Sequence, residues 1–156
     1  MRVVNRNAYY NYEVVEEYEA GLVLSGAEAK SAKSGAISLR GSRAVFRGDD
    51  LGRNELWLLG MQINPYQHAA SDSFEPTRSR KLLLSGRELD SIRGKLVQKG
   101  LTLVPLECYN KASWIKIKLG LVRGKKKYEK RELAKKRAEE KQIQSRLRNT
   151  LKGGKA

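Results

Sequence analysis

One strand, Ser113-Trp-Ile-Lys-Ile-Lys-Leu-Gly-Leu-Val122, organises this chain of 156 residues. Its isoleucines and leucines alternate with Trp114, Lys116 and Lys118, and a period of two is typical of a strand that buries one face. The other face presents an aromatic ring and two cations, which predicts an RNA-binding surface, because bases stack on aromatic rings and lysines attract phosphates. The alternative is that Trp114 packs at the edge of the core and that the lysines only solubilise this face.

Four further segments are predicted as strands, namely residues 12–24, 37–47, 55–63 and 101–109. The last of these forms a hairpin with residues 113–122 through a turn at Asn110–Ala112, and the second and third form another across the loop Gly48–Asn54. Because the strands do not alternate with helices, the sequence predicts an antiparallel sheet that curls or closes. We therefore expect a mainly β fold, a small barrel of the oligonucleotide-binding kind with flanking helices.

Two short helices are predicted by the same capping box, Ser25-Gly-Ala-Glu28 and Ser85-Gly-Arg-Glu88. In a capping box the serine hydroxyl and the glutamate carboxylate each satisfy a free backbone amide of the first turn. The first helix ends near Gly35 and has only small apolar side chains. The second ends near Gly100, and its apolar face consists of Leu89, Ile92, Leu96 and Val97.

The C-terminal end, residues 123–156, holds most of the excess charge, because 14 Lys or Arg and 4 Glu give it +10 of the chain's +15. Residues 129–148 are mostly Ala, Leu, Glu, Gln, Lys and Arg, which favour a helix. The apolar positions form a stripe too narrow to pack on a core, and they are Leu133, Ala138, Ile143, Leu147 and Leu151. We expect this tail to gain its order on a polyanion, because clustered cations displace counterions from a phosphate backbone.

Three parts follow from these patterns. Residues 1–10 are polar and lack an apolar period, so they are predicted to be an N-terminal arm. Residues 11–122 suffice for one modest core and form the RNA-binding barrel with its helices. Residues 123–156 are the basic tail, which is predicted to be helical when it is bound to a partner.

Composition excludes several classes of function. A net charge of +15 and a pI near 10.1 indicate a binder of nucleic acid or of an anionic membrane. No apolar stretch approaches the roughly 20 residues that span a bilayer, and the tail lacks the apolar face of an interfacial helix. The single Cys108 excludes an internal disulfide and, with the single His68, leaves no zinc cluster. We therefore expect a cytoplasmic protein without membrane contact, metal or cofactor.

Candidate catalytic groups are few. His68, Ser71 and Asp72 resemble a triad only in composition, because one polar loop holds all three and nothing orients the imidazole. Four glutamates between residues 13 and 19 have no metal-like spacing and divide between the two faces of a strand, so they are interpreted as solvated. No glycine-rich phosphate loop is present. The sequence thus predicts no catalytic residue and no enzyme.

Six motifs follow one another between residues 5 and 132. They are Tyr18-Glu-Ala-Gly-Leu22, Ser25-Gly-Ala-Glu-Ala-Lys-Ser31, Ile63-Asn-Pro-Tyr66, Arg80-Lys-Leu-Leu-Leu-Ser-Gly-Arg-Glu-Leu89, Lys99-Gly-Leu-Thr-Leu-Val-Pro-Leu106 and Gly120-Leu-Val-Arg-Gly-Lys-Lys126. Their order resembles the SsrA-binding protein family, also called small protein B. The resemblance implies a helix-flanked oligonucleotide-binding barrel that binds the tRNA-like domain of transfer-messenger RNA and delivers it to stalled ribosomes in trans-translation. It also implies a tail that occupies the empty messenger channel near the decoding centre. We expect the protein to bind the RNA as a monomer.

The resemblance implies RNA contacts at Glu28, in the segment Leu82–Leu84 and at Lys116. For Glu28 the capping box offers a competing role, because a capping carboxylate is already bound to its own backbone. Together with the basic and aromatic positions, the predicted RNA-binding residues are Glu28, Lys30, Lys33, Arg80, Lys81, Leu83, Trp114, Lys116 and Lys118. The predicted ribosome-binding residues of the tail are Gly124, Lys125, Lys126, Lys127, Tyr128, Glu129, Lys130 and Arg131.

This chain also departs from the family pattern. Asn7-Ala-Tyr-Tyr-Asn-Tyr12 stands where basic residues are usual, Ala32 where a larger apolar residue is common, and Glu129 where an aspartate is usual. Two other classes of protein stay open from the sequence. One is a structural ribosomal protein with a small barrel and an rRNA-binding tail; the other is an RNA-modifying enzyme, for which no cofactor pocket or acid–base pair is found.

Overall fold

The computed structural model describes residues 1–48, 53–65, 74–98 and 100–153. The chain divides into two compact units, Met1–Gly124 and Lys125–Ala156, and each is described by itself. The loop residues 49–52 and the candidate triad of His68, Ser71 and Asp72 lie outside the described residues.

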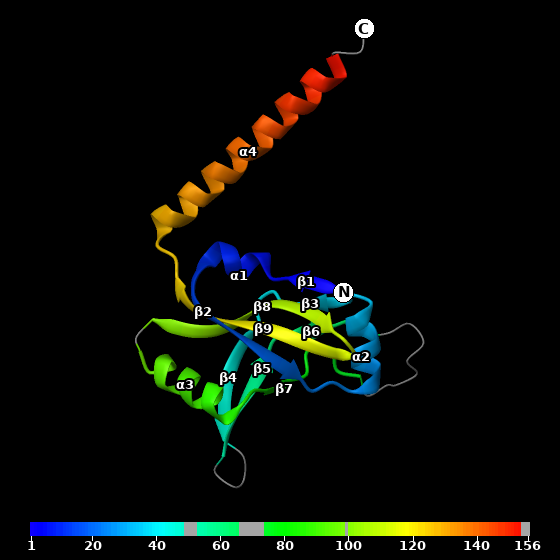
Figure 1. Ribbon diagram of the computed structural model, residues 1–156, viewed down its shortest axis with the longest axis vertical. Coiled ribbons are helices and arrows are strands. Elements are labelled where there is room, and N and C mark those ends of the chain that lie inside the picture. The colour runs from blue at the N-terminus through cyan, green and yellow to red at the C-terminus, as the bar shows by residue number, and fades with distance from the viewer. Residues whose placement is uncertain (49–52, 66–73, 99, 154–156) are drawn as a thin grey trace. The chain divides into compact units, whose positions relative to one another are not determined.

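The first unit is built mainly from strands (Figure 1). The large sheet contains β1 (Arg2–Val4), β2 (Tyr12–Leu22), β4 (Arg43–Gly48), β5 (Asn54–Leu59), β7 (Arg80–Leu83), β8 (Leu101–Lys111) and β9 (Trp114–Gly124). A small second sheet pairs β3 (Ile37–Ser38) with β6 (Gln62–Ile63). Three helices, α1 (Arg6–Asn11), α2 (Gly26–Lys33) and α3 (Gly86–Leu96), lie around these strands.

The pairings of the large sheet close on themselves. β4 pairs with β5, β5 with β7, β7 with β2, β2 with β9 and β9 with β8, all antiparallel. The ring is completed where β8 pairs back with β4 through Leu103 and Ala44. The register of β8 shifts between Pro105 and Glu107, as expected for a residue that has no N–H to donate. The predicted mainly β fold with a sheet that curls is therefore confirmed.

β9 shows why this sheet has two different faces. Ile117, Leu119 and Leu121 are at most 1% exposed and lie in the main core cluster, whereas Trp114 is 72% exposed. The alternation predicted from the sequence is thus present in the fold. On the outer side of β9, Gly120 allows close packing, because a Cβ at this position would meet Leu106 at 2.7 Å.

The N-terminal residues fold onto the barrel, whereas the sequence predicts an arm. β1 pairs with β8, and the buried Asn5 donates its side-chain amide to the carbonyl oxygens of Leu39 (3.2 Å) and Pro105 (2.9 Å). Asn5 also caps α1, and Ala8 packs in a small second cluster that contains Leu106. Backbone pairing with β8 and the buried amide of Asn5 hold this segment in place. Neither contact requires a periodic pattern of apolar residues, so the sequence shows none.

Both predicted capping boxes are present. Ser25 and Glu28 cap α2, and Ser85 and Glu88 cap α3, each through reciprocal side-chain and backbone hydrogen bonds. Gly35 follows α2 with a φ of 82°, a left-handed conformation that glycine adopts without a Cβ penalty. The small Ala32 is completely buried, so α2 packs closely on the core.

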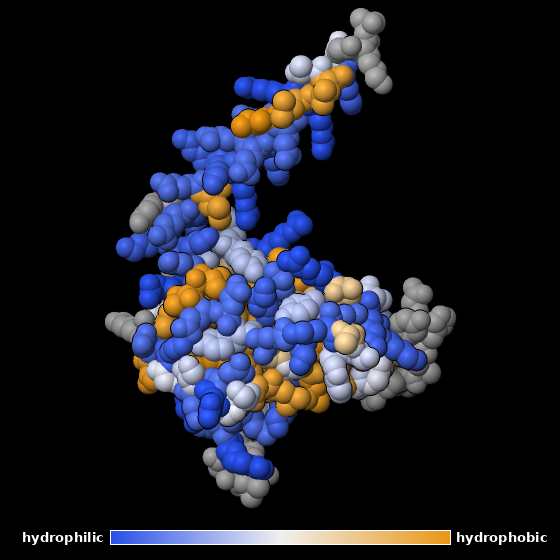
Figure 2. Space-filling view, in the orientation of Figure 1, coloured by the Kyte–Doolittle hydropathy of each residue, from blue (hydrophilic) through white to orange (hydrophobic). Residues whose placement is uncertain are grey.

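The second unit is one helix, α4 (Lys127–Gly153). Its apolar side chains Ile143, Leu147 and Leu151 are 57%, 59% and 78% exposed. Figure 2 shows an apolar strip along the distal part of α4, with hydrophilic side chains around it. The narrow stripe expected from the sequence is therefore present. That this segment changes its order on a partner stays a prediction.

Candidate nucleic-acid interface

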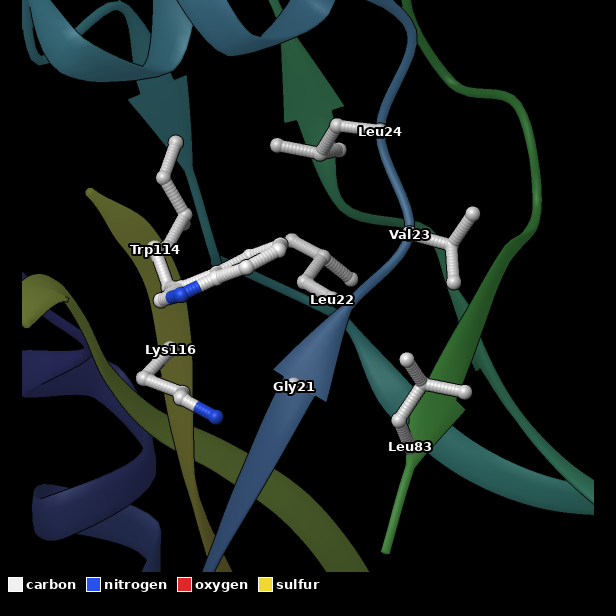
Figure 3. A pocket seen from close by; sticks show the side chains of 8 residues that line it. Gly21, Leu22, Val23, Leu24, Leu83, Trp114 and Lys116 are labelled. Atoms are coloured by element: carbon white, nitrogen blue, oxygen red, sulfur yellow. The ribbon is translucent and has the colours of Figure 1, made fainter.

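A hollow of about 460 Å³ opens where β2 ends between β9 and β7 (Figure 3). We call it the Trp114 pocket. Trp114 and Lys116 project from β9, and Leu83 projects from β7 on the other side of Gly21. Its lining residues are Gly21, Leu22, Val23, Leu24, Leu83, Trp114, Ile115 and Lys116.

The register of the sheet explains why these side chains meet. Leu83 is opposite Gly21 on β2, Gly21 is opposite Lys116 on β9, and Lys116 is opposite Tyr109 on β8. Gly21 has no side chain to separate its neighbours, and a Cβ there would lie 3.3 Å from that of Leu83. Gly21 therefore leaves open space between Leu83 on one side of the pocket and Lys116 on the other.

The pocket exposes apolar surface. Trp114 is 72% exposed, Leu83 is 52% exposed and Val23 is 43% exposed. Clustered exposed apolar side chains beside a charged rim are typical of a binding site. The alternative from the sequence, in which Trp114 packs at the edge of the core, is thereby excluded for this structure.

Lys116 lies in a polar row beside the pocket. Within the described part of the chain it forms no salt bridge. The hydrogen bond from Tyr109, the hydrogen bond from Lys111 and, least of all, the charge of Lys116 lower the pKa of Glu19. Glu19 is held mainly by hydrogen bonds from the Tyr109 hydroxyl and from Lys111 Nζ, the latter at 3.1 Å. Burial, followed by the hydrogen bond to Glu19, raises the pKa of Tyr109 to about 12, so its hydroxyl remains a neutral donor near Lys116.

The other predicted lysines differ in how far they are already paired. Lys118 Nζ lies 3.9 Å from carboxylate oxygens of both Glu17 and Glu107. Lys81 Nζ donates to Glu55 at 2.7 Å. Lys30 and Lys33 are exposed on α2 and are not among the residues that line the Trp114 pocket.

Glu28 and Arg80 are buried and have no surface for the RNA contacts predicted from the sequence. Glu28 is 3% exposed and Arg80 is 0% exposed. The Glu28 carboxylate accepts hydrogen bonds from Arg78, from Arg80 and from the backbone N–H of Ser25, the last at 3.1 Å. Burial opposes ionisation of Glu28, but these donors outweigh it, so its pKa lies below the ordinary value.

Arg80 also binds backbone carbonyl groups of two other segments. Its Nη1 donates to the carbonyl of Met61 at 2.7 Å, and its Nη2 donates to that of Pro76 at 3.0 Å. A buried guanidinium with these partners fixes β7, and so Leu83 at the end of that strand, against α2 and the β6 region. The Glu28–Arg80 pair therefore helps to fix the position of β7, the strand that contributes Leu83 to the pocket.

The predicted tail residues, 124–131, include the end of β9 and the first turns of α4. Gly124 ends β9, and the backbone N–H of Lys126 donates to Glu129 at 3.0 Å, which caps the start of the helix. Lys125, Glu129 and Lys130 are half-buried, whereas Lys126 and Arg131 are exposed. The side chains of Lys127 and Tyr128 lie outside the described residues.

Sequence reasoning missed part of the pocket. The lining residues that were not predicted as site residues are Gly21, Leu22, Val23, Leu24 and Ile115. One signal was available, because an isolated glycine inside a strand pattern often marks a place where another group approaches closely. The exposure of Val23 had no such signal, since it depends on where β2 ends.

Among the described residues, no group of three or more His, Cys, Asp or Glu could hold a metal ion. Cys108 is buried, and burial raises the pKa of its thiol to about 12. None of the helices in the described ranges combines the length and apolar composition of a membrane-spanning segment.

The chain is similar to known proteins along almost all of its length. The family model "SmpB protein" matches residues 2–149. The "SsrA-binding protein" of Trichodesmium erythraeum is 46% identical over 142 residues, covering 90% of this chain and 87% of that one. The "SsrA-binding protein" of Carboxydothermus hydrogenoformans is 46% identical over 144 residues, with 92% and 93% covered.

A solved structure agrees with these relatives. It is described as "tmRNA-SmpB: a journey to the center of the bacterial ribosome", and it matches with a TM-score of 0.65 and 45% identity over 81% of this chain and 85% of that one. The order of motifs predicted this relationship, and the family model and the two relatives establish it. The chain belongs to the SmpB protein family.

Proposed function

We propose that this protein is an RNA-binding adaptor that binds the tRNA-like domain of transfer-messenger RNA and delivers it to stalled ribosomes. Relatives of similar length are named SsrA-binding proteins, and the similar solved structure concerns tmRNA, SmpB and the bacterial ribosome. The single observation that carries the proposal for this chain is the exposed Trp114 pocket with Lys116 beside it.

The pocket supplies two kinds of RNA contact. Trp114 offers an exposed indole on which an unpaired base stacks, and Leu83 and Val23 offer apolar surface to the same base or its sugar. Lys116 supplies a cation for the adjoining phosphate. Gly21 leaves the room that a flat base needs between β7 and β9. Base stacking next to a phosphate contact suits an unpaired loop of a folded RNA better than a continuous duplex.

The tail has a separate role in this proposal. Residues 123–156 carry a net charge of +10, and α4 has no apolar face wide enough for a core of its own. A cationic helix of this kind suits a channel walled by RNA, so we assign the tail to the empty messenger channel near the decoding centre. Residues 11–122 then hold the RNA, the protein acts in the cytoplasm where the ribosomes are, and no step requires it to be an enzyme.

Binding to an isolated tRNA-like domain tests the role of the pocket. We expect Lys116→Glu to weaken the affinity by about tenfold or more at moderate salt, because a phosphate attraction becomes a repulsion. We expect Trp114→Ala to weaken it by a similar factor through lost stacking. The matched control is Arg87→Glu, which reverses the charge of an exposed residue in the first turn of α3.

Two different results would contradict the proposed site and the proposed function. If Lys116→Glu and Trp114→Ala, both shown by thermal unfolding to be folded, bound the RNA like Arg87→Glu, the pocket would not be the site. If the unaltered chain did not prefer the tRNA-like domain to a scrambled RNA of equal length, the proposed function itself would fail.

A further inference from the structure

The outer face of β4, β5 and β7 carries a second group of basic and aromatic side chains. Along β5 and β7, buried residues alternate with partly or fully exposed ones, and in β4 the buried Ala44 lies between the more exposed Arg43 and Val45. The outward set includes Arg43, Arg47, Trp57 and Lys81, which we call the arginine–tryptophan face. The sequence predicted only Lys81 of these four as an RNA-binding residue.

Arg47, Trp57 and Lys81 are linked to one another, directly or through Glu55. Trp57 is opposite Val45 on β4 and opposite Lys81 on β7. The Arg47 guanidinium lies over the Trp57 ring, 5.9 Å from its centroid. Glu55 accepts from Lys81 Nζ at 2.7 Å and from Trp57 Nε1 at 3.3 Å, so it fixes both groups. The indole is therefore held in place, with a cation on each side.

This face is continuous with the Trp114 pocket through β7. Lys81 and Leu83 are two residues apart on one face of that strand, about 7 Å along it. Leu83 lines the Trp114 pocket and also a second hollow of about 320 Å³, whose walls include Lys81 and Glu55. Figure 3 shows Leu83 on the side of Gly21 opposite Lys116. A chain leaving the pocket over Leu83 thus arrives at Lys81.

Charge distinguishes the two directions that an RNA strand could take from the pocket. Toward β9, β8 and β1, four cations of the outer face stand beside three glutamates, and all of the cations except Lys116 lie within 4 Å of one. The cations are Arg2, Lys111, Lys116 and Lys118, and the glutamates are Glu17, Glu19 and Glu107. Toward β5 and β4, the three cations of the arginine–tryptophan face stand beside one carboxylate among the described residues of these strands, Glu55, so the excess of positive charge is larger on this side. A phosphate backbone is attracted to the side with excess positive charge.

We propose that the RNA strand bound in the Trp114 pocket continues over Leu83 onto the arginine–tryptophan face. There Lys81 and Arg47 bind its phosphates, and Trp57 stacks on one of its bases. This inference rests on the proposed function and adds the direction in which the RNA crosses the barrel. The partner is the same RNA, recognised by stacking and by phosphate contacts.

Salt dependence tests the phosphate contact. We expect Arg47→Gln to weaken binding of the isolated tRNA-like domain by about three- to tenfold and to reduce the slope of log K against log salt by about 1. The matched control, Arg87→Gln, removes an equally exposed charge from α3 and should change neither quantity. Equal behaviour of the two variants would overturn the proposal.

Fluorescence tests the stacking, because the chain has only two tryptophans. Trp114→Phe leaves Trp57 as the single tryptophan, and Trp57→Phe leaves Trp114, so selective excitation of tryptophan reports on one site at a time. At saturating RNA we expect the emission of both single-tryptophan variants to be quenched. Quenching of Trp114 alone would show that the RNA stops at the pocket and would overturn the extension, while the proposed function would stand. If neither emission changed although RNA bound, both would fall.

Discussion

The barrel unit, Met1–Gly124, and the tail unit, Lys125–Ala156, use charge and apolar side chains in opposite ways. The barrel carries a net charge of +6 in 124 residues and buries its apolar side chains in two clusters. The tail carries +9 in 32 residues and leaves Ile143, Leu147 and Leu151 exposed on one helix. One unit is held by contacts between distant residues, the other by contacts between near neighbours.

This difference predicts how each unit recognises RNA. The barrel presents Trp114, Leu83 and Lys116 from paired strands, so their spacing is set before RNA arrives. Preorganised groups lose little freedom on binding, which favours the recognition of one particular shape. Helices without tertiary packing are marginal in water, so we expect the tail to adjust its order to the channel that we propose for it.

Removal of the tail is expected to have the largest effect. A chain that ends after Gly124 keeps β9 intact and loses all of α4. We expect it to bind the tRNA-like domain nearly as well as the full chain, with an unchanged thermal midpoint, but to support no tagging of stalled chains in a reconstituted translation assay. If the shortened chain lost RNA binding or folded poorly, the barrel and the tail would not have separate roles.

The Glu28–Arg80 pair is expected to have the largest effect on the barrel. Arg80→Met leaves a buried carboxylate without its buried partner, which should cost about 3–5 kcal/mol of unfolding free energy in urea. The double variant Glu28→Gln with Arg80→Met removes both charges and should recover much of that loss. If Glu28 touched RNA itself, the folded double variant would still bind the tRNA-like domain poorly.

Close packing in the barrel gives the next effect. Gly120→Ala places a Cβ within 3 Å of the buried Leu106, and overpacking of this kind costs about 1–3 kcal/mol. Gly94→Ala in α3 is the control, because a Cβ there meets nothing within 4 Å and alanine favours a helix over glycine by about 1 kcal/mol. Urea denaturation should show opposite signs, and a neutral Gly120→Ala would mean that Leu106 moves aside freely.

The parts of the fold that could be predicted from the sequence are those with local signals. The alternation in β9 and the two capping boxes are properties of a few neighbouring residues, and both are present. The family could be predicted because six motifs keep their order. Trp114 and Lys116 were identified as site residues for the same local reason, since the strand period places both on the outer face.

The remaining features depend on contacts between residues far apart in the sequence. Asn5 is buried because Leu39 and Pro105 accept from its amide, and no pattern near residue 5 announces this. Arg80 is preceded by Arg78 in a basic segment, so it was predicted to be on the surface. It is buried because Glu28, 52 residues earlier, lies beside it.

The smallest expected effect contrasts the two units with a single type of substitution, Ala→Gly. Ala112, in the turn between β8 and β9, has a φ of 55°, a conformation that costs a residue with a Cβ some strain. Ala112→Gly should therefore stabilise the barrel by about 0.5–1 kcal/mol in urea. Ala138 is exposed in the middle of α4, where glycine should cost the helix about 1 kcal/mol.

The two variants also report on whether the units are independent. Ala138→Gly should lower the helical circular dichroism of the full chain while the urea midpoint of the barrel stays unchanged. Ala112→Gly should raise that midpoint and leave the helical signal of the tail as it was. A shift of the barrel midpoint by Ala138→Gly would show that α4 is stabilised by the barrel, because a substitution in an independent helix cannot alter the unfolding free energy of the other unit.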